Sequence, residues 1–281
     1  PGAAIELHRR RACAPADCTP PRSLPVRELA RAGYDVAVPE SVDALRTAVR
    51  HGLNEGVCNH FSMTVPGRED LFLVNPQGLH WSEITPSDIV MADGDGNVIE
   101  GKYEVEPTAF YIHARIHAGN PRAKVVLHTH MPYATALTSI QDGRIEMCTQ
   151  NAFRYWDRIA YDEKYGGVAL SNDEGERMCR AMGDKDILFL RNHGVIVSGP
   201  TVAQTYDDLY YLERAAMVQV LAMQTGRPLH NIDDAMAEHR RIPGVLGDIH
   251  HRQPRRRAVP DGAGGRAHRR RGGSGARPAV Q

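Results

Sequence analysis

The chain has 281 residues, of which 42% are apolar and 24% are charged, and its formal net charge is zero. This length is enough for one domain of about 200 residues with a buried core. The composition argues against a fibre or a wholly disordered chain. Because there is no net positive charge, nothing in the totals indicates nucleic-acid binding.

The composition changes at both ends of the chain. Residues 1–27 are rich in proline and arginine without periodicity and are predicted to form a loose arm. One domain is expected over residues 28–241. Residues 242–281 are basic and poor in large apolar side chains, which predicts a disordered tail. The alternatives are a tail that contacts phosphates or acidic partners, and a segment read in a shifted frame of GC-rich DNA.

No run of 18 apolar residues occurs, and the start of the chain lacks the apolar segment of a signal peptide. The five cysteines follow no metal-binding or disulfide spacing, which suits a reducing compartment. We therefore expect a cytoplasmic protein that has no membrane partner.

The first half of the chain alternates between helical and β-type patterns. Residues 40–53 carry apolar side chains at helical spacing. Short β-type runs follow at residues 57–65, 71–74, 89–92 and 98–99. The last two of these runs flank Asp-Gly-Asp-Gly-Asn, a strong hairpin turn signal.

The second half has longer elements. A helix is predicted over residues 108–118, with Pro107 suited to its first turn, and a buried strand over residues 124–130. Residues 173–183 predict another helix, and residues 186–198 predict two strands around a polar step. A last helix is expected over residues 201–225, where Thr201 and Gln204 make a capping-box pair and Gly226 provides the stop.

Three histidines in these segments have the pattern of a metal site. His128 and His130 are two residues apart on a predicted strand, so both side chains point to the same face. His193 follows an apolar strand and precedes Gly194, which lets the backbone turn sharply. Three imidazoles leave open positions on one Zn²⁺, Mn²⁺ or Fe²⁺ ion, as catalysis requires.

The sequence resembles the class II aldolase and adducin family. The resemblance covers about residues 28–226 and is carried by NHFSMTV, FLVNPQGLHWSEITPSDIV, AFYIHARIHAGNPRAKVVLHTH and RNHGVIVSG. It implies an α/β fold with three layers, α/β/α, around a mostly antiparallel central sheet. It also implies a homotetramer with sites at subunit interfaces, and it matches His128, His130 and His193 to the family's metal ligands.

The resemblance fails at the family's catalytic glutamate, because Ala109 occupies that position. The candidate replacements are Glu106, one helical turn earlier, and His113, which shares a helical face with His117. The alternative roles are a helix-start charge for Glu106 and simple filling for the histidines. Tyr155 is a further catalytic candidate, as a proton donor to an enolate.

The family's substrate-phosphate positions are matched by Asn59, Ser62, Asn75 and Gly78. No lysine follows the Asn-Pro-Gln-Gly loop, which disfavours a sugar phosphate and leaves a carboxylate or carbonyl group as the expected ligand. Two tight turns in a β-rich segment are the alternative reading of these residues.

These features predict a metal-dependent lyase that cleaves a C–C bond in a small oxo or hydroxy acid, either as a decarboxylase or as an aldolase. The absence of the family glutamate favours decarboxylation, which needs no base to deprotonate a hydroxyl group first. Two alternatives stay open. One is a non-haem iron oxygenase that oxidatively decarboxylates an aromatic 2-oxo acid, as in aminocoumarin-type antibiotic pathways. The other is a non-catalytic scaffold like adducin.

Overall fold

The structure is a computed structural model that describes residues 37–167 and 171–232. The arm predicted at residues 1–27 and the tail predicted at residues 242–281 lie outside the described residues. The helices are α2 (Ala37–His51), η2 (Pro86–Asp88), α3 (Pro107–Gly119), α4 (Pro132–Thr138), η3 (Ala152–Tyr155), α5 (Asn172–Met182) and α6 (Val202–Met223). The strands are β1 (His60–Val65), β2 (Arg68–Val74), β3 (Val90–Asp93), β4 (Val98–Glu100), β5 (Val125–Thr129), β6 (Ile159–Asp162), β7 (Ile187–Leu190) and β8 (Gly194–Gly199).

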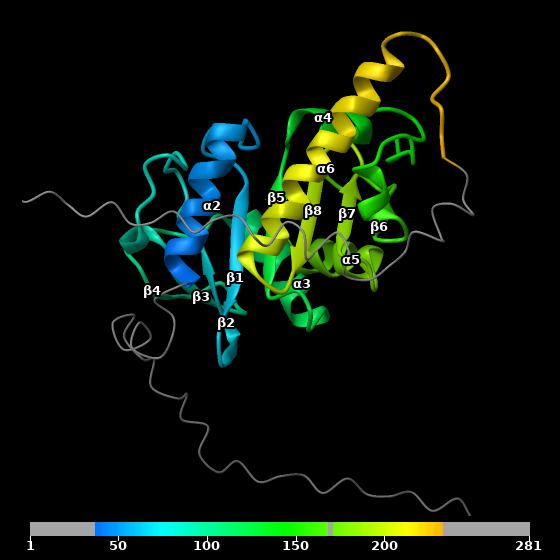
Figure 1. Ribbon diagram of the computed structural model, residues 1–281. Coiled ribbons are helices and arrows are strands. Elements are labelled where there is room, and N and C mark those ends of the chain that lie inside the picture. Colours follow the sequence, from blue (N-terminus) through cyan, green and yellow to red (C-terminus); the bar gives the residue numbers. More distant parts are fainter. Residues whose placement is uncertain (1–36, 168–170, 233–281) are drawn as a thin grey trace, which may run out of the picture.

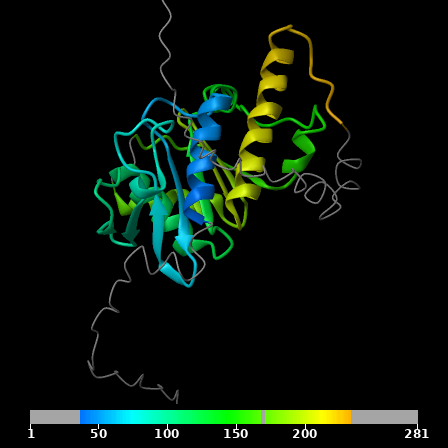
Figure 2. The ribbon, with the colours of Figure 1, turned by 60° about the vertical axis from the view of Figure 1, so that its left-hand side comes forward.

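The strands form one eight-stranded sheet in the order β4-β3-β2-β1-β5-β8-β7-β6. Every neighbouring pair is antiparallel except β6 and β7, which are parallel. Helices α2, α4 and α6 cover one face, and α3 and α5 cover the other (Figures 1 and 2). The predicted three-layer α/β/α arrangement around a mostly antiparallel sheet is therefore confirmed.

Strand β5 lies at the centre of the sheet and is buried on both faces. Val125 and Leu127 belong to the larger core beneath α2 and α6. Val126 belongs to a second core beneath α3 and α5. Because successive side chains of a strand point to opposite faces, His128 lies on the α3 side together with Val126. Burial on both faces explains why this strand reads as a continuous apolar run.

The helix ends follow from local sequence signals. Glu106 is the N-cap of α3, where its side chain accepts a hydrogen bond from the Ala109 N–H group, and Pro107 occupies the first turn. At the start of α6 the Thr201 hydroxyl accepts from the Gln204 N–H group, which is the first half of the predicted capping box. Helix α2 ends where Gly52 adopts a φ of 69°.

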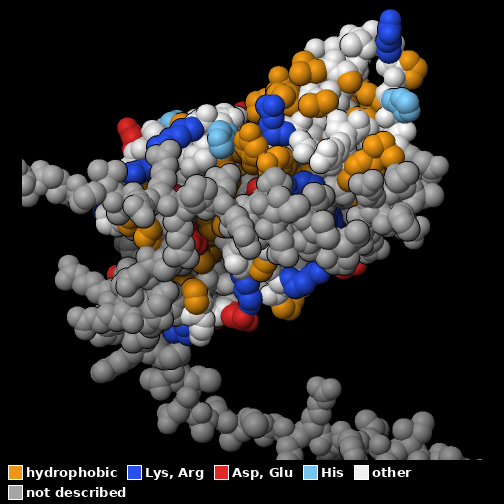
Figure 3. Space-filling model, viewed as in Figure 1, with side chains coloured by type: hydrophobic (Ala, Val, Ile, Leu, Met, Phe, Trp, Pro, Cys, Tyr) orange, Lys and Arg blue, Asp and Glu red, His pale blue; other side chains and the backbone are white. Residues whose placement is uncertain are grey.

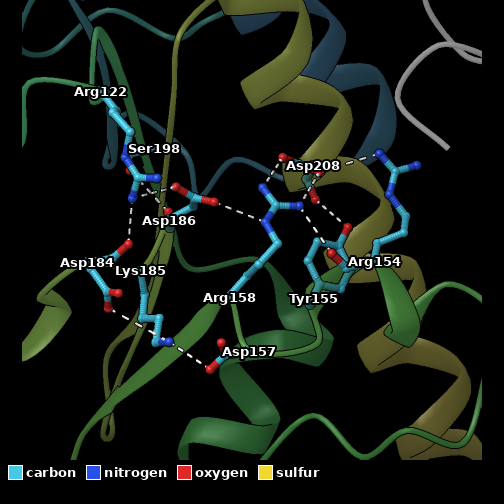
Figure 4. Close-up of polar contacts among 10 residues, drawn as sticks. All are labelled: Arg122, Arg154, Tyr155, Asp157, Arg158, Asp184, Lys185, Asp186, Ser198 and Asp208. Carbon is cyan, nitrogen blue, oxygen red and sulfur yellow. Dashed lines mark hydrogen bonds and ion pairs between the residues drawn. The ribbon is translucent and has the colours of Figure 1, made fainter. Parts of the chain in front are cut away.

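A group of charged side chains joins the segment around η3 to α6 (Figure 4). Arg158 donates from Nη2 to Asp208 Oδ2 at 2.8 Å and from Nε to Asp186 Oδ2 at 3.0 Å. Arg154 lies 3.4 Å from the same Asp208 carboxylate, and the Tyr155 hydroxyl donates to the Asp208 backbone carbonyl at 2.8 Å. Asp208 is buried and is the carboxylate that the two guanidinium groups share. Arg154 also pairs with Asp207.

The C-terminal part of α6 exposes Val218, Leu221 and Met223. Apolar side chains are visible along this part of the molecule in Figure 3. Within the described residues, none of the helices combines the length and the apolar character needed to span a bilayer.

We expect Asp208→Ala to lower the free energy of unfolding by about 2–3 kcal/mol. This loss of stability is smaller than the loss expected on breaking a fully buried ion pair, because the Arg158 side chain is 30% exposed. Chemical denaturation followed by circular dichroism measures the change.

The matched control is Glu176→Ala, which removes a carboxylate from an ion pair whose side chains are 69% and 52% exposed. This control should alter stability by less than about 0.5 kcal/mol. Equal effects in the two variants would show that the Asp208 cluster contributes no more than a surface pair.

Candidate metal centre

Three imidazole rings converge at one end of β5. His128 lies in β5, His130 follows the strand, and His193 lies in the turn between β7 and β8. The ring centroids are 5.0 Å apart for His128 and His130, 4.9 Å for His128 and His193, and 4.8 Å for His130 and His193. One nitrogen from each ring lies within 4.8 Å of the other two, a spacing at which all three could bind one ion.

The sheet brings His193 to the other two histidines. Strands β5 and β8 are antiparallel, with Thr129 opposite Val195. The residues just before β8 therefore lie beside those just after β5. A side chain at Gly194 would meet the Thr129 carbonyl oxygen at 2.6 Å and the His130 ring at 2.7 Å. Glycine is required here because the two segments approach so closely.

Hydrogen bonds orient two of the rings. His128 Nδ1 lies 3.0 Å from the Val195 carbonyl oxygen, and since that oxygen can only accept, Nδ1 carries the proton. His130 Nδ1 contacts the Glu55 carboxylate at 2.5 Å. Both contacts direct Nε2 toward the centre of the triad. His130 Nε2 is buried and has no hydrogen-bond partner among the described residues, which fits a nitrogen that binds a metal ion.

Burial keeps two of these candidate ligands, His128 and His193, neutral. Burial lowers the pKa of His193 to about 4, with smaller contributions from His130 and His60. Burial, followed by the neighbouring His193, also holds the pKa of His128 well below its usual range. Neutral imidazole is the form that binds a metal ion, so the pocket is prepared for a cation at neutral pH.

A further histidine, His60 on β1, lies against the triad. It is paired with His128 across the β1–β5 ladder, and the two rings stack with centroids 5.2 Å apart. His60 Nε2 lies 3.2 Å from Glu106 Oε2. Burial raises the pKa of the Glu106 carboxyl, but contacts with His60, Thr108 and the Ala109 N–H group outweigh it and lower that pKa to about 2. Glu106 is therefore the predicted helix-start charge, and it also contacts His60, which stacks on the candidate metal ligand His128.

Helix α3 contributes the other predicted histidines. His113 and His117 both point at the Ser62 hydroxyl, at 2.6 Å and 2.7 Å. The two histidines therefore share one helical face, as predicted. This face packs against Ser62 of β1, one of the predicted substrate-binding residues. Ala109 lies in the first turn of the same helix and is buried.

The asparagines support the loop that leads to the site. Asn59 has a φ of 74°, an uncommon conformation outside glycine, and its Oδ1 accepts from the His130 N–H group at 3.3 Å. Its Nδ2 is buried and has no partner among the described residues. Asn75 accepts from the Phe61 N–H group at 2.7 Å. Gly78 lies in an exposed turn with a φ of 80°.

Tyr155 is not brought to the histidines. Its ring is buried in the core on the α6 face of the sheet, whereas His128 lies on the α3 face. Its hydroxyl is occupied by the Asp208 carbonyl group, and burial holds its pKa well above the usual range. These contacts give Tyr155 a structural role, and we leave it out of the functional proposal.

Two residues at the site were not singled out from the sequence. Glu55 holds His130, and His60 stacks on His128. A signal for His60 was present, because His60 and Ser62 have the same alternating spacing as His128 and His130. Glu55 offered no such signal, since it lies in an irregular segment before β1.

The sequence pattern of the Class II Aldolase and Adducin N-terminal domain matches residues 40–220. The chain therefore belongs to the class II aldolase and adducin family. A protein of Caulobacter vibrioides named for aldolase class 2 is 37% identical over 65% of this chain and 70% of its own length. Decarboxylase NovR of Streptomyces niveus is 29% identical over 72% of this chain and 73% of its own length. A 4-hydroxy-3-prenylphenylpyruvate oxygenase/4-hydroxy-3-prenylbenzoate synthase of Streptomyces roseochromogenus is 29% identical over 65% of this chain and 66% of its own length.

Solved structures share the fold. An aldolase II superfamily protein from Pseudomonas syringae superposes with a TM-score of 0.69 and 32% identity, covering 73% of this chain and 82% of that protein. The L-fuculose 1-phosphate aldolase of Glaciozyma antarctica gives a TM-score of 0.67 and 26% identity, covering 78% of this chain and 84% of that protein.

We expect His128→Ala, His130→Ala and His193→Ala each to abolish stoichiometric binding of Zn²⁺ while leaving the domain folded, because each removes one of three converging nitrogens. Metal analysis after dialysis measures retention, and circular dichroism measures folding. His51→Ala, at an exposed histidine on α2, is the matched control. A double His128/His130 variant that kept one equivalent of metal would refute the assignment.

We expect Glu55→Ala to lower Zn²⁺ affinity by about tenfold, the lower end of the range for residues that orient a metal ligand. The lower end applies because the Glu55 side chain is 61% exposed. Competition with a chromogenic chelator measures the affinity. Glu83→Ala, outside the triad's contacts, should leave it unchanged, and an equal affinity in both variants would mean that Glu55 does not orient His130.

Proposed function

We propose that this chain is a metal-dependent lyase that cleaves a C–C bond in a small oxo or hydroxy acid. The observation that carries the proposal is the convergence of His128, His130 and His193 beside the Glu106–His60 pair. A divalent ion held by the three imidazoles would stabilise the negative charge that develops on a substrate oxygen when the bond breaks. Relatives named as aldolases and as a decarboxylase support this class of reaction.

Either route requires one proton to move. Aldol cleavage removes a proton from a hydroxyl group before the C–C bond breaks, whereas decarboxylation adds a proton to carbon afterwards. We place that proton between His60 Nε2 and Glu106 Oε2, which are 3.2 Å apart. This pair takes the place of the family glutamate, whose position is occupied by the buried Ala109.

The polar groups around the triad fit an acid better than a sugar phosphate. The buried Asn59 amide has no protein partner for its Nδ2 among the described residues, and a carboxylate or carbonyl oxygen would satisfy it. Asn75 and Ser62 are already bonded within the fold, so we assign them to positioning rather than to direct substrate contact.

An oxygenase is the second candidate, supported by the relative named as an oxygenase and synthase. Three imidazoles, grouped with no carboxylate among the described residues, also suit Fe²⁺. A scaffold without catalysis is disfavoured, because scaffolding gives no reason to keep a buried His130 Nε2 that lies beside two other imidazoles and has no hydrogen-bond partner in the described part of the chain. A homotetramer remains part of the proposal and is supported by the exposed apolar side chains on α6.

The test is to load the protein separately with Zn²⁺, Mn²⁺ and Fe²⁺ and to incubate each form with a panel of small 2-oxo, 3-oxo and hydroxy acids. A lyase releases CO₂ or an aldehyde without consuming oxygen. An oxygenase acts only with Fe²⁺ and consumes oxygen in proportion to product. Failure of all three forms across the panel, with the metal bound, would favour the scaffold.

We expect Glu106→Gln to lower turnover by about 10²–10⁴-fold while leaving metal affinity unchanged. Glutamine keeps an acceptor for the Ala109 N–H group, so the start of α3 should remain capped. The matched control is Glu104→Gln, an exposed carboxylate two residues earlier. Full activity in the Glu106 variant would remove this residue from the mechanism.

A further inference from the structure

Helix α4 joins the backbone segments that carry two of the three candidate metal ligands. It begins at Pro132, two residues after His130. At its other end the Thr138 carbonyl oxygen accepts from the Asn192 N–H group at 3.0 Å, and Asn192 directly precedes His193. Asn192 has a φ of 55°, an uncommon conformation outside glycine. A displacement of α4 would therefore move the backbone beside both histidines.

The start of α4 is held by a side chain from another helix. Met131, at the N-cap position, makes no side-chain cap hydrogen bond, and Pro132 has no N–H group. The N–H groups of Tyr133 and Ala134 are therefore the first that need an acceptor. Both donate to the Glu213 carboxylate, at 2.8 Å to Oε1 and at 2.9 Å to Oε2. Glu213 is buried and lies on α6.

We propose that Glu213 is a positioning residue for the metal centre. By capping α4 from α6 it fixes the backbone beside His130 and, through the far end of α4, the backbone beside His193. The inference rests on the proposed function only in taking the three histidines as metal ligands.

The length of α4 makes this contact important. A helix of seven residues is too short to be stable alone, so its position depends on what it packs against. It packs against α6 and β8 (Figure 1). Helix α6 has 22 residues, and Leu209, Leu212 and Ala216 on it are completely buried, so it provides a firm support. A negative charge at the start of α4 is also favoured by the helix dipole.

The two N–H groups require a carboxylate in particular. Burial raises the pKa of the Glu213 carboxyl to about 6, although the N–H groups of Tyr133 and Ala134 lower it. The fold therefore works against the charged form, and glutamine, which has the same shape, would avoid that cost. Glutamine offers only one acceptor oxygen, however, and its NH₂ group would face an N–H donor. Glu213→Gln thus disturbs the start of α4 while sparing the stability of the domain.

The first measurement is the Zn²⁺ affinity of the Glu213→Gln variant, by competition with a chromogenic chelator. We expect the affinity to fall by about 10- to 100-fold, as for residues that orient metal ligands. The melting temperature should change by no more than about 4 °C. The matched control is Gln219→Ala, which truncates another buried side chain of α6, one that bonds the backbone of residues 144 and 146. It should leave the Zn²⁺ affinity unchanged and lower the melting temperature at least as much.

The second measurement is amide hydrogen exchange of the metal-free protein, followed by NMR. In Glu213→Gln we expect faster exchange at Tyr133 and Ala134, and also at Asn192, whose N–H group bonds the far end of α4. Gln219→Ala should change none of the three. Should Glu213→Gln fail to fold, Glu213→Asp keeps the charge on a shorter side chain and should show both changes to a smaller degree.

The parent Zn²⁺ affinity in a folded Glu213→Gln variant would overturn the inference. An equal fall in Gln219→Ala would do the same, as would faster exchange confined to Tyr133 and Ala134. A parent protein that binds no Zn²⁺ would overturn the inference together with the metal centre. A protein that shows the expected affinities and exchange rates but turns over none of the acids would refute the proposed function and leave the role of Glu213 standing.

Discussion

The antiparallel pairing of β5 between β1 and β8 is the constraint on which the site depends. Pairing with β8 places His193 beside His130, and pairing with β1 places His60 directly opposite His128. Strands β5 and β8 contribute side chains to both hydrophobic cores, whereas β1 contributes Phe61 and Val65 to the larger core alone. Burial of both faces of β5 fixes its register. A slip of one residue in β5 would turn His128 toward α6 and dismantle the triad.

The histidine-rich layer between the sheet and α3 is stable because its imidazole rings are neutral and are joined by hydrogen bonds. Burial disfavours the charged imidazolium form, as the lowered pKa of His113 shows. The ring nitrogens instead form hydrogen bonds with another imidazole, as between His60 and His113, or with an oxygen, as between His117 and the Ala123 carbonyl group. Glu106, at the edge of this layer, has a lowered carboxyl pKa despite its burial, because His60 and Thr108 contact it and because it accepts from the Ala109 N–H group as the cap of α3. Fold stability and site chemistry thus use the same hydrogen bonds.

Much of the fold could be predicted because its elements have strong local signals. Helix α6 has a Thr201 cap and a glycine stop, the β3–β4 hairpin has its turn residues, and α3 begins at Pro107. The short 3₁₀ helices η2 and η3 were missed, as were α4 and β6. Helix α4 has only seven residues, too few for periodicity to register, and its start is held by the distant Glu213 carboxylate. Strand β6 has four residues and exists through parallel pairing with β7.

The sequence by itself determined the three metal-binding candidates, because alternation along a strand places His128 and His130 on one face whatever surrounds them. It also determined the loss of the family glutamate at Ala109 and the shared face of His113 and His117. Only the tertiary structure decided that His60 stacks on His128, that Glu55 holds His130, and that Tyr155 lies in the opposite core. The His60–His128 contact joins residues 68 positions apart, and the Glu55–His130 contact joins residues 75 positions apart. A local sequence pattern cannot predict such contacts, because they depend on which strands become neighbours.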